Sequence, residues 1–309
     1  MSVFEMLPVD ITKRLASCKI AEQDLREIRI RYNRGLCVTT SDGGKMIGLN
    51  GGYTGKESQA FCVTEQLFRD TLDRLTGYSL YAFEEEIRQG FFTVSGGHRV
   101  GVAGHAVFEQ GKMLRLTEIG YLNIRIAHEI KNCSKKLYDV LFGQGKLWHT
   151  LLFAPPGCGK TTYLRDLIRL LSEQGVKVGV ADERSELAAG VRGRAQFDLG
   201  VHTDVMDGCP KAMAMQMLLR SMNPDVLAAD ELGTKEDVQA VRLAAGSGCK
   251  VVASAHAESM DELRENPMLG TLWEERRFER YVKLGKRGEQ FGVEAVFDGQ
   301  GEELWKQLY

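Results

Sequence analysis

Residues 154–162 carry the most specific pattern in the chain and read Ala154-Pro155-Pro156-Gly157-Cys158-Gly159-Lys160-Thr161-Thr162. An apolar run, residues 147–154, leads into it and predicts a β-strand, and residues 161–172 predict a helix. A glycine-rich turn between a strand and a helix is the context of a phosphate-binding loop, the Walker A motif. Its first position is Ala154 instead of the usual glycine, which puts a slightly bulkier residue at the strand end.

The residue types in this loop suit a nucleoside triphosphate. Gly157 and Gly159 allow backbone N–H groups to turn inward around phosphate oxygens, and a helix N-terminus favours negative charge. Lys160 is expected to neutralise the β- and γ-phosphates, and the Thr161 hydroxyl to ligate Mg²⁺. We therefore expect ATP and Mg²⁺ as ligands. The predicted nucleotide-binding residues are Pro156, Gly157, Cys158, Gly159, Lys160, Thr161 and Thr162.

A second motif ends in a pair of carboxylates. Residues 226–229 predict an apolar strand that ends at Asp230 and Glu231, which is typical of a Walker B motif. In an open parallel sheet, ligands bind beyond the carboxyl ends of the strands. We expect Asp230 to hold Mg²⁺ together with Thr161, and Glu231 to activate the attacking water as general base. A solvated turn is the alternative interpretation of two adjacent acids.

An acidic segment follows another predicted strand, residues 178–181. It reads Asp182-Glu183-Arg184-Ser185-Glu186. Glu183, with Asp182 beside it, is predicted to lie near the γ-phosphate or its metal and to support the attacking water. An ordinary charged loop is the alternative.

A histidine ends the strand predicted for residues 251–255. Its position after the Walker B segment predicts that His256 hydrogen-bonds the γ-phosphate or a carboxylate and so senses the phosphate. A structural histidine is the alternative. The predicted catalytic residues are therefore Glu231, Glu183, His256 and Lys160.

Arginines at positions 184, 192, 194 and 220 lie between these motifs. Many ATPases complete their site with an arginine from a neighbouring subunit, which stabilises charge on the transferring phosphoryl group. Arg192 and Arg194, in the segment GVRGRAQ, are the candidates for this role. Ordinary surface arginines are the alternative.

Composition limits the class of protein. The formal net charge is −2, so no overall basic balance indicates nucleic acid as the main partner. The seven cysteines form no C-x-x-C pair and are odd in number, which favours reduced thiols in the cytoplasm. No signal peptide and no transmembrane run is visible, so we expect a cytoplasmic protein that reaches a membrane only through a partner or a surface.

Two domains are predicted. Residues 1–145 mix helices with antiparallel strands: residues 64–76 predict an amphipathic helix capped by a threonine, and residues 91–107 predict strands with a hairpin turn at Gly96-Gly97. Residues 127–141 predict a helical connector. Residues 146–309 alternate strands with helices, which predicts a parallel sheet covered on both faces. The boundary is expected near residue 145.

The order of these motifs resembles the secretion-type (type II/type IV traffic) ATPase superfamily. Segments outside the nucleotide motifs are similar to a branch of it that acts in stage III of sporulation in endospore-forming bacteria; they are 81–107 (YAFEEEIRQGFFTVSGGHRVGVAGHAV), 123–130 (NIRIAHEI), 278–285 (FERYVKLG) and 293–297 (VEAVF). The resemblance covers nearly the whole chain. It implies an α/β fold, a RecA-like P-loop ATPase domain preceded by a smaller α+β N-terminal domain.

Roles and partners follow from the resemblance residue by residue. It implies that Lys160 and Thr161 bind nucleotide, and that Glu183 belongs to the acidic box, Glu231 to the Walker B motif and His256 to the histidine box. It also implies ATP as the nucleotide, a hexameric ring of identical subunits, and channel proteins of a sporulation secretion complex as membrane-embedded partners. Traffic ATPases commonly have glycine before the Walker B glutamate, whereas this chain has an aspartate there, residue 230, which favours its role as a metal ligand.

An ATP-hydrolysing motor is the function that these observations favour. The alternative is an ATP-driven nucleic-acid motor, because helicases and recombinases share the RecA-like core. A modest basic cluster adds to this alternative but also fits a solvated face or a docking surface; it comprises Arg26, Arg29, Arg31, Arg34 and Lys45. A switch that binds ATP without turnover is disfavoured by the intact Asp230-Glu231 pair. A phosphotransferase is disfavoured because it must exclude the water that Glu231 would activate.

Overall fold

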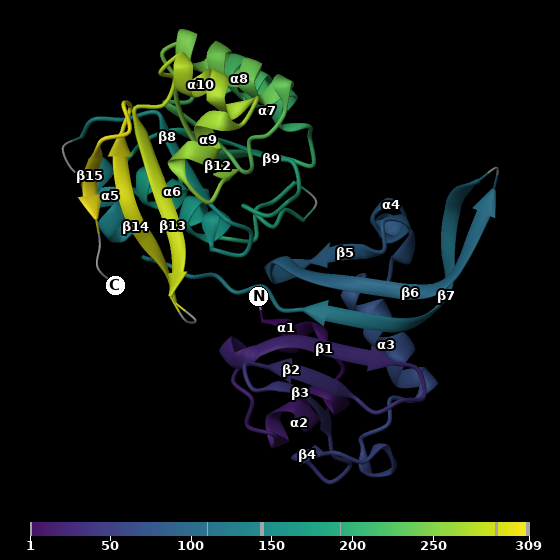
Figure 1. Ribbon diagram of the computed structural model, residues 1–309. Coiled ribbons are helices and arrows are strands. Elements are labelled where there is room, and N and C mark those ends of the chain that lie inside the picture. The colour runs from purple at the N-terminus through teal and green to yellow at the C-terminus, as the bar shows by residue number, and fades with distance from the viewer. Residues whose placement is uncertain (1, 110, 143–144, 192, 288–289, 307–309) are drawn as a thin grey trace. The chain divides into compact units, whose positions relative to one another are not determined.

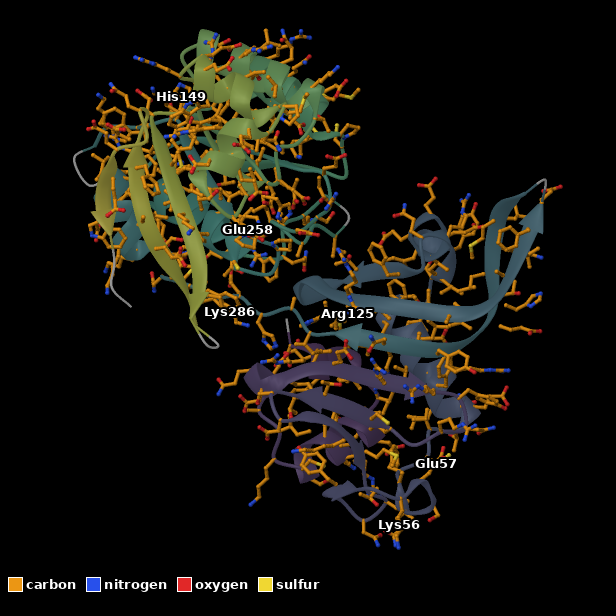
Figure 2. The ribbon with its side chains drawn as sticks, viewed as in Figure 1. Lys56, Glu57, Arg125, His149, Glu258 and Lys286 are labelled. Carbon is orange, nitrogen blue, oxygen red and sulfur yellow. The ribbon has the colours of Figure 1, made fainter. Side chains whose placement is uncertain are left out.

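The computed structural model describes residues 2–109, 111–142, 145–191, 193–287 and 290–306. Figure 1 shows its helices and strands, and Figure 2 adds the side chains. The chain divides into two compact units, Met1–His128 and Glu129–Tyr309. The division lies before the boundary expected near residue 145, because helix α5 (Lys135–Phe142) packs against α6 (Lys160–Glu173) within the second unit.

The first unit contains an antiparallel sheet of seven strands in the order β4-β3-β2-β1-β7-β6-β5. The strands are β1 (Leu25–Arg31), β2 (Cys37–Thr40), β3 (Gly43–Ile47), β4 (Tyr53–Thr54), β5 (Phe91–Val94), β6 (His98–Glu109) and β7 (Lys112–Arg125). The helices are α1 (Val3–Met6), α2 (Val9–Ser17), α3 (Glu65–Leu75) and α4 (Glu84–Arg88), with 3₁₀ turns at Glu22–Asp24, Glu57–Gln59, Leu80–Phe83 and Ser95–Gly97.

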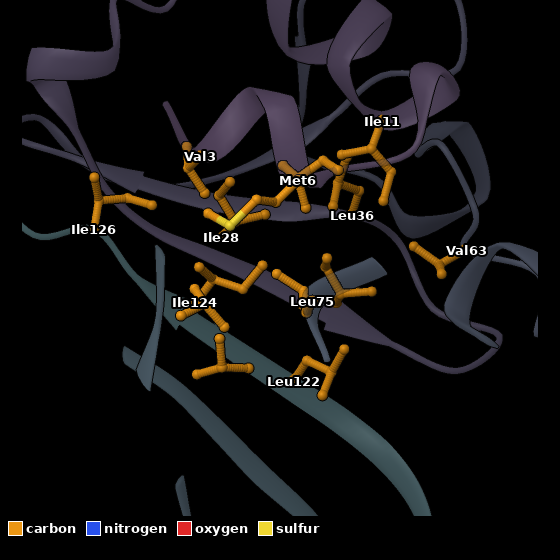
Figure 3. Close-up of a cluster of buried hydrophobic side chains, with 14 of the residues drawn as sticks. Val3, Met6, Ile11, Ile28, Leu36, Val63, Leu75, Leu122, Ile124 and Ile126 are labelled. Carbon is orange, nitrogen blue, oxygen red and sulfur yellow. The ribbon is translucent and has the colours of Figure 1, made fainter. Parts of the chain in front are cut away.

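The helices of the first unit share one hydrophobic core with its sheet. Figure 3 shows Ile28 of β1 and Ile124 of β7 facing Met6 of α1 and Ile11 of α2, and all four are buried. Alternate residues of a strand point to opposite faces, so this core fixes the register of the central strands.

Two predictions for the first unit are confirmed. Helix α3 begins after Thr64, whose hydroxyl accepts a hydrogen bond from the N–H of Leu67. Strands β5 and β6 pair antiparallel around the turn at Gly96 and Gly97, both of which have positive φ.

The second unit contains a mixed sheet of eight strands in the order β10-β9-β11-β12-β8-β13-β14-β15. The strands are β8 (Thr150–Ala154), β9 (Val178–Asp182), β10 (Thr203–Asp207), β11 (Val226–Ala229), β12 (Lys250–His256), β13 (Arg280–Arg287), β14 (Gln290–Asp298) and β15 (Glu303–Lys306). The remaining helices are α7 (Lys211–Ser221), α8 (Lys235–Gly246), α9 (Met260–Glu265) and α10 (Leu269–Glu274).

The strands predicted around the nucleotide motifs are parallel, but the sheet is not parallel throughout. Strands β10, β9, β11, β12, β8 and β13 pair in parallel. Strands β14 and β15 follow β13 through short connections and therefore pair antiparallel. The expected parallel sheet is therefore corrected to a mixed sheet.

Each face of the sheet carries its own buried cluster. Leu151 and Phe153 of β8 pack in the cluster that includes residues of α7, α8, α9 and α10. Leu152 and Ala154 of the same strand pack in the cluster that includes residues of α5 and α6. The continuous burial of β8 explains why residues 151–154 are all apolar instead of alternating.

The connector differs from its prediction. Residues 127–134 are not helical, and only α5 is. The backbone N–H groups of Asn132 and Ser134 bond to the carboxylate of Asp166 on α6, at 2.9 and 2.7 Å, in place of helical partners. Local apolar spacing cannot reveal a partner that lies more than thirty residues away.

Two negative findings complete the fold. Among the described residues, no helix combines the length and the apolar character that crossing a bilayer requires. All seven cysteines are free thiols.

Candidate functional site

The glycine loop joins β8 to α6. Gly157 and Gly159 have φ values of 74° and 80°, a left-handed backbone that glycine adopts without strain. A Cβ atom on Gly159 would also lie 3.4 Å from the Cβ of Phe291 on β14. Helix α6 starts at Lys160, so the loop turns the chain directly into a helix N-terminus, where N–H groups are free to bind an anion.

The ammonium group of Lys160 lies at the centre of the site and is buried. It donates hydrogen bonds to the carbonyl oxygens of Ala154 and Pro155, at 2.8 and 3.0 Å, and to Nδ1 of His256 at 2.9 Å. Burial lowers the pKa of Lys160, and the carboxylates of Asp230 and Glu231 act in the opposite direction. A phosphate would supply the counter-charge that this buried cation needs.

Asp230 follows β11 and receives two hydroxyl donors. Thr161, in the first turn of α6, donates to its Oδ2 at 2.6 Å, and Ser254 of β12 donates to its Oδ1. The parallel register of β11 and β12 brings Ser254 to the end of the neighbouring strand. The predicted pairing of Thr161 with Asp230 is therefore present as a direct contact.

Glu231 lines the same pocket as the glycine loop. Its Oε2 accepts a hydrogen bond from Arg184 at 2.8 Å, and its Oε1 lies 3.1 Å from Nε2 of His256. Because the Lys160 ammonium can only donate, Nδ1 of His256 accepts and Nε2 carries the proton toward Glu231. His256 thus bridges the loop lysine and Glu231.

The acidic segment after β9 divides into buried and exposed carboxylates. Asp182 is buried and accepts from the backbone N–H groups of Glu186, Leu187 and Ala188. Burial raises its pKa although these three donors lower it. Asp182 therefore shapes the turn, whereas Glu183 is exposed.

A pocket of about 630 Å³ opens over the glycine loop. Its lining residues are Ile130, Cys133, Pro156, Gly157, Gly159, Lys160, Thr161, Thr162, Tyr163, Glu186, Asp230, Glu231, His256 and Phe291. Of the predicted site residues, Cys158 and Glu183 are not in this lining. Glu183 lines an adjoining pocket of about 400 Å³, whose wall also includes Asp230, Glu231 and His256.

The predicted arginines have different surroundings. Arg184 lies in the site through Glu231. Arg194 is exposed and its backbone pairs with Val191, and Arg220 is exposed in the last turn of α7. Arg192 lies outside the described residues.

The basic cluster of the N-terminal sequence is partly neutralised. Arg29 pairs with Glu27 and Arg34 with Glu57. Arg29, Arg31 and Lys45 line a hollow of about 570 Å³ on the first unit.

The residues present fit Mg²⁺. The ion prefers hard oxygen ligands and keeps several waters, so one carboxylate and one hydroxyl beside substrate phosphates suffice. Asp230 and Thr161 supply these two oxygens 2.6 Å apart. Within the described ranges, no group of three or more His, Cys, Asp or Glu side chains could hold a metal alone.

Several residues of the site were not singled out for a role by sequence reasoning, among them Ser254, Lys211, Cys133 and Phe291. Ser254 and Lys211 contact the Asp230-Glu231 pair, the latter through a 2.6 Å hydrogen bond from its Nζ to the carbonyl oxygen of Glu231. Cys133 and Phe291 line the pocket from the connector and from β14. Ser254 stands two residues before His256, so its place at the end of the predicted strand could have identified it. Lys211, Cys133 and Phe291 are brought to the site by packing between segments that are distant in sequence.

Comparison with known proteins identifies the family. The family model described as Sporulation stage III, protein AA matches residues 1–304. Stage III sporulation protein AA of Bacillus subtilis (strain 168) is 39% identical over 310 residues, which cover 98% of this chain and 96% of that protein. The chain belongs to the stage III sporulation protein AA family.

Solved structures show the fold of this family member. The ATPase DotB of Legionella pneumophila has a TM-score of 0.59 at 16% identity, covering 95% of this chain and 82% of DotB. The pilus retraction motor PilT with bound ADP has a TM-score of 0.61 at 16% identity, covering 100% of this chain and 84% of PilT. The fold is therefore that of the RecA-like secretion ATPases.

Proposed function

We propose that this chain is a Mg²⁺-dependent ATPase that works as a motor and energises a membrane channel or assembly complex during endospore formation. One observation carries the proposal: Lys160, Asp230, Glu231 and His256 meet at one pocket, directly over a glycine loop that opens a helix. The pilus retraction motor, whose solved structure contains ADP, has the same fold, and the family is one of sporulation proteins.

The side chains have separate roles in the proposed reaction. The loop N–H groups and Lys160 bind the phosphates, and Asp230 with Thr161 would hold the metal. Mg²⁺ when bound would neutralise charge on the phosphate oxygens. Glu231 accepts the proton of the attacking water, and His256 orients Glu231 through its Nε2 proton.

Glu183 is proposed only for an outer role. It is exposed and lines the adjoining pocket, so it would act on the attacking water through Arg184 or through solvent and not by direct contact with phosphate. Ring assembly, a cytoplasmic location and docking to membrane-embedded channel proteins belong to the same proposal and are supported by the resemblance to traffic ATPases.

Two substitutions test the ATPase proposal. Lys160→Ala is expected to abolish binding of a fluorescent ATP analogue. Glu231→Gln is expected to bind it normally and to release phosphate more than about 100-fold more slowly, because a general base contributes that much. Glu258→Gln, an exposed glutamate outside the pocket lining, is the matched control. Normal turnover by the Glu231→Gln protein would show that Glu231 is not the base.

A further inference from the structure

We infer that Ser254 is a positioning residue for Glu231, setting the geometry of the proposed general base without touching substrate. The inference rests on the proposed ATPase function. It starts from one hydroxyl that contacts both members of the acidic pair. Ser254 Oγ accepts a hydrogen bond from the N–H of Glu231 at 3.0 Å and donates to Oδ1 of Asp230.

The direction of these hydrogen bonds is fixed by chemistry. A backbone N–H only donates and an ionised carboxylate only accepts, so the single hydroxyl proton must point to Asp230. The two hydrogen bonds, from the Glu231 N–H to Ser254 and from the Ser254 hydroxyl to Asp230, run in the same direction. Successive hydrogen bonds of this kind strengthen each other. Ser254 has 0% exposure, so water does not compete for its hydroxyl.

The backbone of Glu231 needs such a restraint. Its φ is 51°, in the left-handed region that a residue with a side chain rarely adopts without strain. Ser254 holds the turn from both sides of the residue: its Oγ binds the Glu231 N–H, and its carbonyl oxygen accepts from the N–H of Leu232 at 2.7 Å. This turn directs the Glu231 side chain toward His256 and Arg184.

A purely structural role predicts different behaviour. A buried serine can serve only to satisfy a backbone N–H, as Ser172 does: it has 0% exposure and its Oγ accepts from the N–H of His202 at 2.7 Å. Loss of either hydroxyl leaves one N–H without its acceptor and lowers stability. Only loss of the Ser254 hydroxyl should change turnover.

The test compares Ser254→Ala, Ser254→Thr and Ser254→Cys with the matched control Ser172→Ala in the full-length protein. Each variant is assayed for affinity for a fluorescent ATP analogue, for single-turnover phosphate release and for thermal unfolding. Ser254→Ala is expected to bind the analogue within about twofold of the unmodified protein and to lose at least about tenfold in turnover, since small misplacement of a reacting group has effects of this size. Ser254→Thr, which keeps the hydroxyl, is expected to recover most of the rate.

A double variant separates this inference from the proposed function. If Ser254 acts through Glu231, Ser254→Ala should cause no further loss in a Glu231→Gln background. An equal loss in both backgrounds, or full turnover of Ser254→Ala, overturns the inference. If Ser254→Ala does not fold, Ser254→Cys takes its place, and unchanged turnover there also overturns it. Full turnover of Glu231→Gln alone contradicts the proposed function instead.

Discussion

His149, labelled in Figure 2, is a histidine that the folded protein keeps neutral. Burial lowers its pKa to about 4, and Lys250 and Arg277 act in the same direction while Glu279 opposes them. Its Nδ1 accepts a hydrogen bond from the N–H of Val251 at 3.1 Å, which a protonated ring could not do.

We predict that this residue makes stability depend on pH. The pKa of His149 is about 6.5 in the unfolded chain and lower in the folded chain. Its contribution to the free energy of unfolding is therefore full above pH 6.5 and is lost as pH falls toward 4. Between pH 7.5 and 5 the free energy of unfolding should drop by about 1–2 kcal/mol more than in His149→Asn, allowing for partial solvent screening. Urea unfolding at both pH values measures this, and equal drops in the two proteins would refute it.

The site residues that the sequence predicts are those tied to a strand end or a helix start. Lys160, Thr161, Asp230 and His256 could be found because motif order and the chemistry of phosphate require them. The sequence identifies Arg184 as a candidate but does not predict its hydrogen bond to Glu231. That contact depends on the turn after β9, which the buried carboxylate of Asp182 stabilises. Glu183 was predicted for the site from its position in the acidic segment, but it lines the adjoining pocket instead.

At the scale of elements, α6 joins the glycine loop to the connector. Asp166 on α6 is buried, accepts from the N–H groups of Asn132 and Ser134, and pairs with Arg169 at 2.7 Å. Ser134 also donates to the carbonyl oxygen of Tyr163 on α6, at 2.7 Å. The connector is therefore fixed to the helix that begins at the phosphate loop.

We predict that Asp166→Ala lowers the free energy of unfolding by about 2–4 kcal/mol, because the buried Arg169 loses one of its two carboxylate partners and keeps only Glu173. Two backbone N–H groups also lose their acceptor. Asp139→Ala, at an exposed position on α5, is the control and should change stability by less than about 0.5 kcal/mol. Urea unfolding of both variants decides the matter; similar values for the two would contradict this account of the connector.

The elements that local patterns predict are the buried strands and the helices between them. Strands β8, β9, β11 and β12 lie within a few residues of their expected ranges, because continuous apolar runs identify them. Strands β10, β13, β14 and β15 were not predicted as elements. Strands β10 and β15 form the two edges of the sheet, where incomplete burial leaves a weak apolar signal, and β13 is placed by its pairing with β8, which is distant in sequence.

For the molecule as a whole, we propose an ATPase that acts as an assembled motor. The resemblance implies a ring with nucleotide sites completed by neighbouring subunits, and such sites make specific activity rise with protein concentration. A monomeric ATPase would have a specific activity that does not depend on protein concentration. An ATP-dependent switch would bind ATP without turnover. These three possibilities differ in two observables, mass and phosphate release.

Size-exclusion chromatography with light scattering, with and without ATP and Mg²⁺, combined with phosphate-release assays across protein concentrations, distinguishes an assembled motor from the other two possibilities. We predict that the mass rises above that of the 34.4 kDa chain when Mg-ATP is present and that specific activity increases with the fraction assembled. Lys160→Ala should show neither effect. A chain that hydrolyses ATP at a constant specific activity while it remains monomeric, or that assembles and binds ATP without releasing phosphate, would contradict the account.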